Sequence, residues 1–329
     1  MDTAKKIAFG CGGLIAVPFI GLAVRFNIVF RPLLLGCILW ASPLYAQQIG
    51  ATVNLGDWSS RLTLHSLGAV FGTNMAAGEC TADRTPLPNN LCGVTVTLSD
   101  ETGAETLAPL FYVSPTQINF QVPGSQWFRG KDQTRSQSAT SVILQLRIDP
   151  AGISHNVTID LLPMPVILEY QTSEGIQEPI VLHTDGTLVA KENPAEWDEH
   201  LIAYGLGFGV YTEDNAIALD QGLWSDSFPL DGHAAPLDRL VEFLPGLILQ
   251  ASGHVGTQPI FERYTIPDFV GLAPGFVGLN QINFRLPCLT SNSPEPEIAI
   301  ESFLGGRTNP YRIPISEAAK AKWGTIACN

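Results

Sequence analysis

The tetrapeptide Q-I-N-F occurs twice in the sequence, each time in a stretch that has the pattern of one β-strand ended by a proline. The first stretch is PLFYVSPTQINFQVP (Pro109 to Pro123) and the second is GLAPGFVGLNQINFRLP (Gly271 to Pro287). Apolar and polar residues alternate in both, so successive side chains point to opposite faces of the strand. This alternation is typical of an antiparallel sheet packed on one side, and the terminal proline ends the hydrogen-bonded ladder. The chain is therefore predicted to be a duplicated β module.

The two strands have equivalent faces. The apolar residues expected to share the buried face are Ile118, Phe120 and Val122 in the first copy, and Ile282, Phe284 and Leu286 in the second. The polar face is formed by Gln117, Asn119 and Gln121, or by Gln281, Asn283 and Arg285. We interpret the polar faces as the solvated or interface side of a sheet, which is also the side available for recognition.

Length and composition favour two all-β domains. The chain has 329 residues, long enough for two ordinary domains, and 45% of them are hydrophobic, enough to build real cores. Only 15% are charged, while 31 glycines and 24 prolines supply many turns. The formal charge of −13 and the low pI argue against binding to a phosphate backbone, so we expect no nucleic-acid partner.

The N-terminus carries two apolar stretches, Ile7 to Val24 and Leu33 to Ala46, separated by a segment with two arginines. Basic residues, an apolar core and a cleavage point before Gln47 are the parts of an export signal. The alternative is a retained membrane anchor, with residues 7–46 as the only contact with a membrane. We expect residues 1–46 to be an export signal or membrane anchor. The protein is then secreted or in the cell envelope, or membrane-anchored with its domains outside.

Six cysteines are present, and four of them follow the N-terminal segment. An even number of cysteines in an exported protein favours disulfides. Cys80 and Cys92 bracket a turn-rich loop, and Cys288 directly follows the second Q-I-N-F strand. Of the three connectivities that four cysteines allow, we expect the local one, Cys80 with Cys92 and Cys288 with Cys328. A cysteine metal site is the competing idea, and no C-x-x-C spacing supports it.

The strand pattern suggests where each domain begins and ends. Strands are predicted at Gly93 to Ser99, Leu107 to Val113 and Val142 to Ile148. Prolines at positions 163 and 165 interrupt regular structure and mark a boundary. We expect a first β-sandwich at 47–162, a linker with a connecting hairpin at 163–200, and a second β-sandwich at 201–329.

Several strings in the second half carry a resemblance to a known family. They are LHTDGTLV, ENPA, the YGLGFG run and GLAPGFVGLNQINFRLP, in that order. They resemble the immunoglobulin-like modules of secreted acidobacterial proteins described as the Solibacter uncharacterised C-terminal domain. The upstream half, with VFGTN, LCGVTVTL and APLFYVSPTQINFQVP, is similar to the module that often precedes it. The resemblance implies an all-β fold of two tandem immunoglobulin-like (IPT/TIG-like) β-sandwich domains. The family has no established activity, so the resemblance indicates the fold more than the function.

Acidic residues between Thr212 and Asp238 could supply oxygen ligands for calcium. Their spacing fits no EF-hand or nonapeptide pattern, so a solvated acidic loop that keeps the protein soluble is the preferred interpretation. We expect no cofactor, with calcium as the alternative. The calcium candidates are Glu213, Asp214, Asp220 and Asp226.

Two tryptophans lie in the same loop-rich part of the chain, Trp224 within the acidic segment and Trp197 upstream of it. Aromatic side chains on sandwich loops can stack on sugar rings, although a loop tryptophan more often packs over a sheet edge. These two residues are the candidates for carbohydrate binding.

The six histidines are scattered, with no H-E-x-x-H motif, and no G-x-S-x-G motif is present. A hydrolase would need Ser252, His254 or the acidic residues to converge in one pocket. We expect no enzyme and no catalytic residues. The favoured function is a non-catalytic binding, adhesion or structural module at the cell surface, whose partner is an unidentified protein or glycan. Carbohydrate binding is the first alternative and an uncharacterised hydrolase the second.

Overall fold

The computed structural model describes residues 48–101, 103–124, 141–160, 164–196, 198–208, 231–238, 240–242, 247–255, 258–286, 297–302 and 311–322. This part of the chain is almost entirely β-strand, and its one described helix is the short α2 (Glu317–Lys322). The prediction of an all-β protein is confirmed. No described helix combines the length and apolar character that crossing a bilayer requires.

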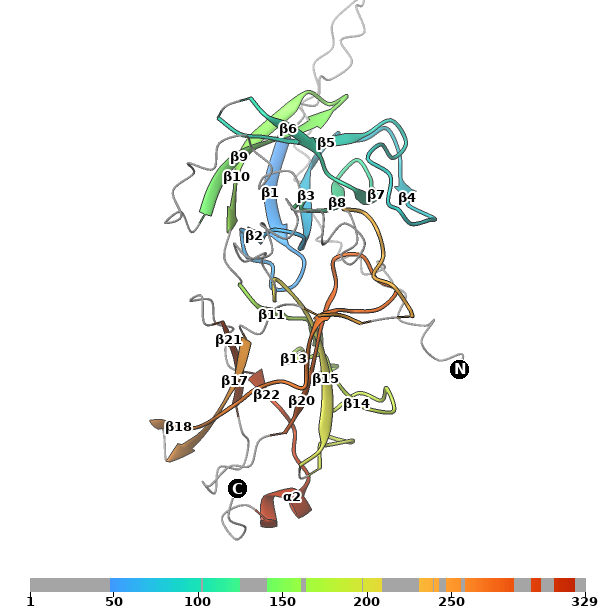
Figure 1. The fold of residues 1–329 in the computed structure, drawn as a ribbon. Coiled ribbons are helices and arrows are strands. Elements are labelled where there is room, and N and C mark those ends of the chain that lie inside the picture. Colours follow the sequence, from blue (N-terminus) through green and yellow to red (C-terminus); the bar gives the residue numbers. More distant parts are fainter. Residues whose placement is uncertain are drawn as a thin grey trace, which may run out of the picture. The chain divides into compact units, whose positions relative to one another are not determined.

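The first half of the chain forms two five-stranded sheets that face each other (Figure 1). Sheet 1 has the strand order β1 (Gln48–Asn54), β3 (Leu67–Thr73), β8 (Gln117–Gln121), β7 (Leu110–Val113) and β4 (Cys80–Thr81). Sheet 2 has the order β2 (Arg61–Thr63), β10 (Ile153–Asp160), β9 (Ser141–Asp149), β5 (Thr95–Ser99) and β6 (Glu105–Leu107). The β2–β10 pair is parallel, and the other pairs in these two sheets are antiparallel.

A continuous apolar core fills the space between sheets 1 and 2. Its members come from alternate positions of both sheets, because successive side chains of a strand point to opposite faces. Residues with no exposed surface include Val70, Ile118, Phe120, Val96, Leu98, Leu146 and Ile148. The core therefore leaves the other face of each sheet available to solvent or to a partner.

The second half contains two further sheets and a two-stranded ribbon. Sheet 3 has the order β11 (Val166–Ile167), β15 (His200–Leu206), β20 (Asn280–Arg285), β19 (Phe269–Leu272) and β16 (Val241–Glu242), with β14 (Val181–His183) also paired to β15. Sheet 4 has the order β18 (Gln258–Thr265), β17 (Leu247–Val255), β21 (Glu297–Ser302) and β22 (Tyr311–Arg312). The ribbon pairs β12 (Glu169–Gln171) with β13 (Gln177–Pro179).

The strand order of the first half recurs in the second. When the five strands in the order given for sheet 1 and for sheet 3 are numbered along the chain, both sheets have the spatial order 1-2-5-4-3, so that β3–β8–β7 corresponds to β15–β20–β19. Sheet 4 likewise repeats β6–β5–β9–β10 of sheet 2 as β18–β17–β21–β22. The repeat visible in the sequence thus corresponds to a repeated order of strands.

Both Q-I-N-F strands have the buried face that the sequence predicts. Ile118, Phe120 and Val122 have no exposed surface, and Ile282, Phe284 and Leu286 are exposed by 3% or less. Each strand is central in its sheet, β8 between β3 and β7 and β20 between β15 and β19. On the opposite face Gln121 is also buried, because its Oε1 accepts a 2.6 Å hydrogen bond from Gly232 N.

Residues 107–113, expected as one strand, are divided between the two sheets of the first half. Strand β6 ends at Leu107 in sheet 2, and β7 begins at Leu110 in sheet 1. Pro109, which has no N–H to donate, lies at the crossing. Ala108 N bonds back to Val96 O, and Leu110 N bonds to Pro88 O. The apolar run is continuous in sequence, but its two halves belong to different hydrogen-bonded ladders.

The segment expected to connect the two halves contributes strands to sheet 3. Within the range expected for the connecting hairpin, a turn begins at His183, with Gly186 N bonded to His183 O and His183 N to Thr187 O. Strands β11 and β14 both pair with β15, and Ile167 and Val181 lie in the second core.

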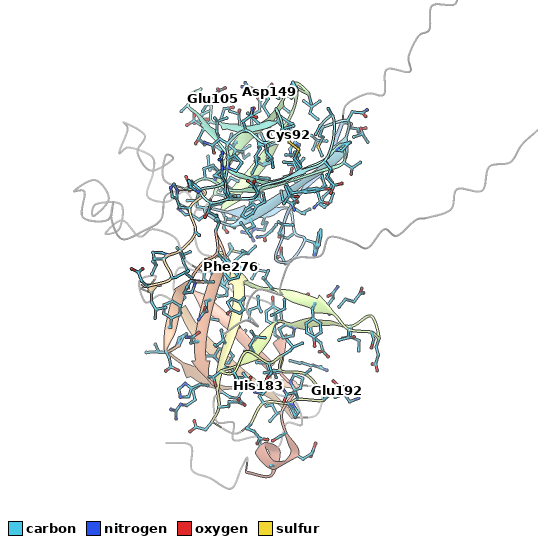
Figure 2. All side chains as sticks on the ribbon, turned by 90° about the vertical axis from the view of Figure 1, so that its right-hand side faces the viewer. Cys92, Glu105, Asp149, His183, Glu192 and Phe276 are labelled. Atoms are coloured by element: carbon cyan, nitrogen blue, oxygen red, sulfur yellow. A yellow bond between two sulfur atoms is a disulfide. The ribbon has the colours of Figure 1, made fainter. Side chains whose placement is uncertain are left out.

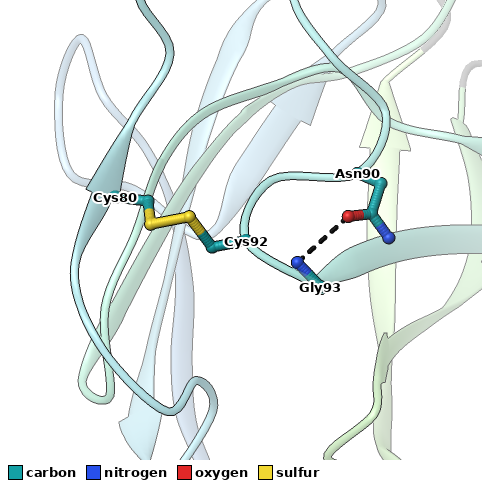
Figure 3. The surroundings of a disulfide bond; sticks show 4 residues. All are labelled: Cys80, Asn90, Cys92 and Gly93. Carbon is teal, nitrogen blue, oxygen red and sulfur yellow. Dashed lines mark hydrogen bonds between the residues drawn. A yellow bond between two sulfur atoms is a disulfide. The ribbon is translucent and has the colours of Figure 1, made fainter.

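The expected disulfide between Cys80 and Cys92 is present (Figure 3). It joins β4 to the turn before β5, a turn also held by a 3.0 Å hydrogen bond from Gly93 N to Asn90 Oδ1. Cys288 and Cys328 lie outside the described residues.

Candidate binding groove

The outward face of sheet 2 presents a band of polar side chains. On β5, Val96 and Leu98 point into the core, so Thr95, Thr97 and Ser99 point outward. On β9, Leu144, Leu146 and Ile148 are in the core, and the outward positions are Gln145, Arg147 and Asp149. The register pairs Thr95 with Asp149 and Thr97 with Arg147, which places the two polar rows side by side.

A groove of about 540 Å³ lies on this face. Strands β5, β6 and β9, with one residue from the loop before β5, form its walls. The lining residues are Asn89, Thr95, Thr97, Glu105, Thr106, Leu107, Arg147 and Asp149. Its volume is within the range of small-molecule and oligomer sites in proteins, about 300 to 1,000 Å³.

Arg147 is the centre of the charge network in the groove. Its Nε donates a 2.9 Å hydrogen bond to Asp149 Oδ2, and its Nη1 donates a 3.2 Å hydrogen bond to Glu105 Oε1. The hydrogen bond that Arg147 donates to Asp149 and the charges of Asp149 and Glu105 raise the pKa of Arg147. Figure 2 shows Glu105 and Asp149 close to each other on sheet 2. A guanidinium held between two carboxylates has a fixed orientation, because its fork of donors is rigid.

This arrangement suits the binding of a hydroxyl-rich or amide-rich ligand. The guanidinium retains further N–H donors and each carboxylate retains an acceptor oxygen. Of the three threonines, Thr95 is half-buried, whereas Thr97 and Thr106 are buried. The lining side chains are one guanidinium, two carboxylates, three threonine hydroxyls, one amide and one leucine. The groove therefore presents both hydrogen-bond donors and hydrogen-bond acceptors to a ligand.

A histidine–carboxylate pair lies at the turn of the second half where Figure 2 labels His183. His183 Nδ1 is 2.6 Å from Glu199 Oε1, and its Nε2 is 3.1 Å from the Asn193 carbonyl. Burial lowers the pKa of His183, but the hydrogen bonds to Glu199 and Asn193 and the charges of Glu199 and Asp185 outweigh it and raise the pKa overall. Because both ring nitrogens are occupied, this histidine fixes the loop and is not presented to a ligand.

A second histidine lies in a surface network on sheet 3. His200 Nδ1 is 3.0 Å from Asp268 Oδ2, and its Nε2 is 2.9 Å from Arg285 Nη2. Arg285 Nη1 also donates to Asp198 Oδ2 at 2.9 Å. Here too the contacts occupy both ring nitrogens, so the network is a chain of hydrogen bonds that ends in the Arg285–Asp198 ion pair and leaves no ring nitrogen free to act as a general base.

The residues proposed from sequence for other sites fall largely outside the described part of the chain. This applies to the calcium candidates Glu213, Asp214, Asp220 and Asp226 and to the carbohydrate candidates Trp197 and Trp224. Ser252 and His254 lie on β17, where their backbones pair with Phe261 and Pro259. Their side chains lie outside the described part, so the hydrolase alternative stays a prediction. Within the described residues, no group of three or more His, Cys, Asp or Glu side chains could hold a metal ion.

The groove residues were not singled out from sequence, although a signal for them exists. The stretches TVTLS and QLRID both alternate, and their polar positions are Thr95, Thr97 and Ser99 in one and Gln145, Arg147 and Asp149 in the other. Only the pairing of β5 with β9 reveals that these rows are neighbours.

A scan against protein-family models finds no match to this chain, and a search of curated proteins finds none either.

Proposed function

We propose that this chain is a non-catalytic binding protein that acts at or outside the cell surface. Its two halves are tandem β-sandwiches of the immunoglobulin-like, IPT/TIG-like type, and they serve recognition or adhesion. The observation that carries the proposal is the polar groove over β5, β6 and β9, centred on Arg147. Its partner is a protein or glycan at the cell surface.

Two observations support an extracellular location. The Cys80–Cys92 disulfide belongs to the type of cross-link that persists in oxidising compartments. The N-terminal segment has the basic and apolar parts of an export signal or anchor.

The repeated strand order supports the tandem-sandwich interpretation. Each half has one sheet in which five strands follow the same order, with the Q-I-N-F strand in the middle, and a second sheet in which four strands follow the same order. In such sandwiches the scaffold is rigid, and recognition belongs to exposed strand faces and loops.

A carbohydrate is the second candidate ligand class, and the composition of the groove favours it. Sugar hydroxyls both donate and accept hydrogen bonds, and the groove alternates a guanidinium, two carboxylates and threonine hydroxyls along one surface. The ion pairs hold these groups in place before a ligand arrives, which lowers the entropic cost of binding.

Titration of the purified full chain with soluble xylan, pectin, dextran and peptidoglycan fragments tests the proposal. Calorimetry of the wild type and of Arg147→Ala measures the affinity, and a reducing-sugar assay measures any cleavage. We expect saturable binding of at least one probe, at least tenfold weaker in the variant, with no cleavage. Catalytic cleavage of a probe would contradict a non-catalytic role, and unchanged affinity in Arg147→Ala would show that the groove is not the site.

Arg84→Ala is the matched control, because Arg84 is an exposed arginine in the loop closed by the disulfide. It changes the net charge by the same amount as Arg147→Ala but leaves the groove intact. Equal losses in both variants would indicate a general charge effect instead of a site.

Calcium binding is tested by thermal unfolding with calcium and with EDTA. A ligand that binds only the folded chain adds about 2.7 kcal/mol at a hundredfold excess over its Kd. Calcium binding by the acidic residues would be supported if calcium raises the Tm of the wild type and Glu213→Gln or Asp220→Asn abolishes this increase. An unchanged Tm would leave them as a solvated acidic segment.

A further inference from the structure

Trp58 presents its indole ring to solvent on the outward face of sheet 1. The residue is 63% exposed, although its ring stacks on that of Phe71 with centroids 6.2 Å apart and an interplanar angle of 29°. An exposed tryptophan supported from below by a second ring is a flat apolar platform. Sheet 2 carries the groove, so this platform is on the other sheet of the same half.

The turn that carries Trp58 is closed by hydrogen bonds on both sides. Trp58 N donates to Asn54 O at 2.9 Å, and Asn54 N donates to Ser59 O at 2.8 Å. The Asn54 side chain accepts from Gly56 N at 2.8 Å and donates to Arg61 O at 3.3 Å. These bonds fix the backbone of the turn, and the contact with Phe71 supports the indole ring.

Trp58 also adopts a backbone conformation that large side chains avoid. Its φ is +61°, in the left-handed region that favours glycine or asparagine. Such conformations persist only where the surroundings impose them, and they are concentrated at ligand-binding sites.

Two amide side chains lie beside this aromatic pair. Phe71 on β3 is directly opposite Gln117 on β8, and Asn119 is two positions further along the same face. Gln117 Nε2 donates a 2.8 Å hydrogen bond to Asn119 Oδ1. This bond leaves the Gln117 Oε1 acceptor, one N–H of Gln117 and both N–H groups of Asn119 for another partner. The Phe71 ring on β3 therefore lies next to the amide acceptor and donors of Gln117 and Asn119 on β8.

We propose that Trp58, Phe71, Gln117 and Asn119 form a stacking site for a neutral saccharide. A sugar ring has an apolar C–H face that matches the indole and hydroxyl groups that match the amides. None of the four side chains carries a charge, which favours a neutral ligand over an acidic one. The inference rests on the proposed function in that it assumes a ligand-binding role, but it names a different surface and a ligand class.

The size of the platform favours a sugar over a protein. A stable protein interface buries about 800 Å² on each partner, whereas one aromatic side chain offers about 150 to 250 Å². One indole, stacked on Phe71, with two amides on the strand next to Phe71 matches the footprint of one or two sugar rings.

The second half provides an internal comparison. Gln281 and Asn283 repeat the amide pair with the same 2.8 Å hydrogen bond, and Tyr204 is the aromatic residue opposite Gln281. Gln281 is only 9% exposed, and burial raises the pKa of Tyr204. The same strand pattern is covered in the second half, so the open platform is specific to the first.

Calorimetric titration of the full chain with cellohexaose, maltohexaose and chitohexaose tests the inference. We expect at least one to bind, with at least tenfold weaker binding in Trp58→Ala and a smaller loss in Trp58→Phe, which keeps a ring. Because Trp58 is exposed, the Tm of both variants should stay close to that of the wild type. Ile143→Ala is the matched control, because Ile143 is 65% exposed on the other sheet, and it should bind as the wild type does.

The outcomes separate this inference from the proposed function. Binding that Arg147→Ala abolishes and Trp58→Ala leaves unchanged would overturn the stacking site while the groove and the binding role stand. If none of the three sugars binds, the stacking site is overturned. The same holds if this face binds a protein instead of a sugar. Cleavage of a bound sugar would contradict the non-catalytic role, while a loss of affinity in Trp58→Ala would still support the platform.

Discussion

Gln117 Nε2 donates a 2.8 Å hydrogen bond to Asn119 Oδ1, the acceptor two positions further along the same face of β8. Gln281 and Asn283 form the same bond at the same distance on β20. The repeat therefore preserves the polar face of the Q-I-N-F strand as well as its apolar face. On a strand, side chains at positions i and i+2 are neighbours, so the spacing in the motif is the one that lets two amides meet.

We expect the two amide pairs to contribute equally to folding. Asn119→Ala and Asn283→Ala each remove one partly buried hydrogen bond, so each should lower the free energy of unfolding by about 0.5 to 1.5 kcal/mol. Urea unfolding at constant pH measures both. If one variant loses stability and the other does not, the hydrogen bond does not stabilise the fold in the half whose variant is unchanged.

The buried faces of the Q-I-N-F strands were predictable because the alternation that produces them is local. Val96 and Leu98 on β5 were predictable for the same reason. The crossing between Leu107 and Leu110 was not, because an apolar run looks the same whether or not it changes sheet. The division depends on which backbone groups form hydrogen bonds. The partners of Ala108 and Leu110 are Val96 and Pro88, which lie outside the apolar run, so the periodicity of the run cannot reveal them.

The candidate sites were less predictable than the fold. Thr97 and Arg147 become neighbours only through the register of β5 and β9, which no local pattern contains. Trp58 was missed because a lone tryptophan in sequence is usually a core residue, and its exposure depends on the turn that holds it. Sequence reasoning instead favoured tryptophans and carboxylates in residues 196–238, where many candidates cluster.

Gly68→Ala is expected to destabilise the first half through a clash in the core. A Cβ at this position would lie 2.9 Å from Phe120 Cζ and 3.2 Å from Leu62 Cδ2. Overpacking of this kind costs about 1 to 3 kcal/mol. Phe120→Leu removes the obstructing ring atoms, so the double variant should lose less than the sum of the single losses. Additive losses in a urea-unfolding cycle would contradict the contact.

Removal of the Cys80–Cys92 disulfide should destabilise the first half by about 3 kcal/mol, the value expected for a short loop. The two cysteines are 12 residues apart, so the cross-link restricts a small part of the unfolded chain. Urea unfolding of Cys80→Ala/Cys92→Ala measures the loss. The control is the wild type in reductant, which should unfold at the same urea concentration as the variant if this bond is the one that matters.

His155 should make stability fall on acidification. Burial lowers its pKa, its Nε2 is 2.8 Å from Thr52 Oγ1, and its Nδ1 is buried with no partner among the described residues. A histidine with a lowered folded pKa contributes stability above its unfolded pKa, about 6.5, that is lost as pH falls through the folded value. Urea unfolding from pH 7.5 to pH 5 should show this loss in the wild type and a smaller one in His155→Gln.

His183 should act in the opposite direction, because its partners raise its pKa despite burial. A raised folded pKa contributes stability below the unfolded value of about 6.5 that is lost as pH rises through the folded value. Glu199→Gln removes the charge that pairs with His183 at 2.6 Å while keeping the shape of the side chain. The free energy lost in this variant should be about 1 to 3 kcal/mol at pH 5.5 and smaller at pH 8.5.

Glu105→Gln is the control for this pH dependence, because its partner Arg147 keeps its charge across the same range. Its effect on unfolding should be small and equal at the two pH values, as for an exposed ion pair. If Glu199→Gln also had a pH-independent effect, the contact would be an ordinary hydrogen bond in the loop and His183 would remain neutral. A loss confined to pH 5.5 would show that the hairpin turn of the second half is held by a charged histidine.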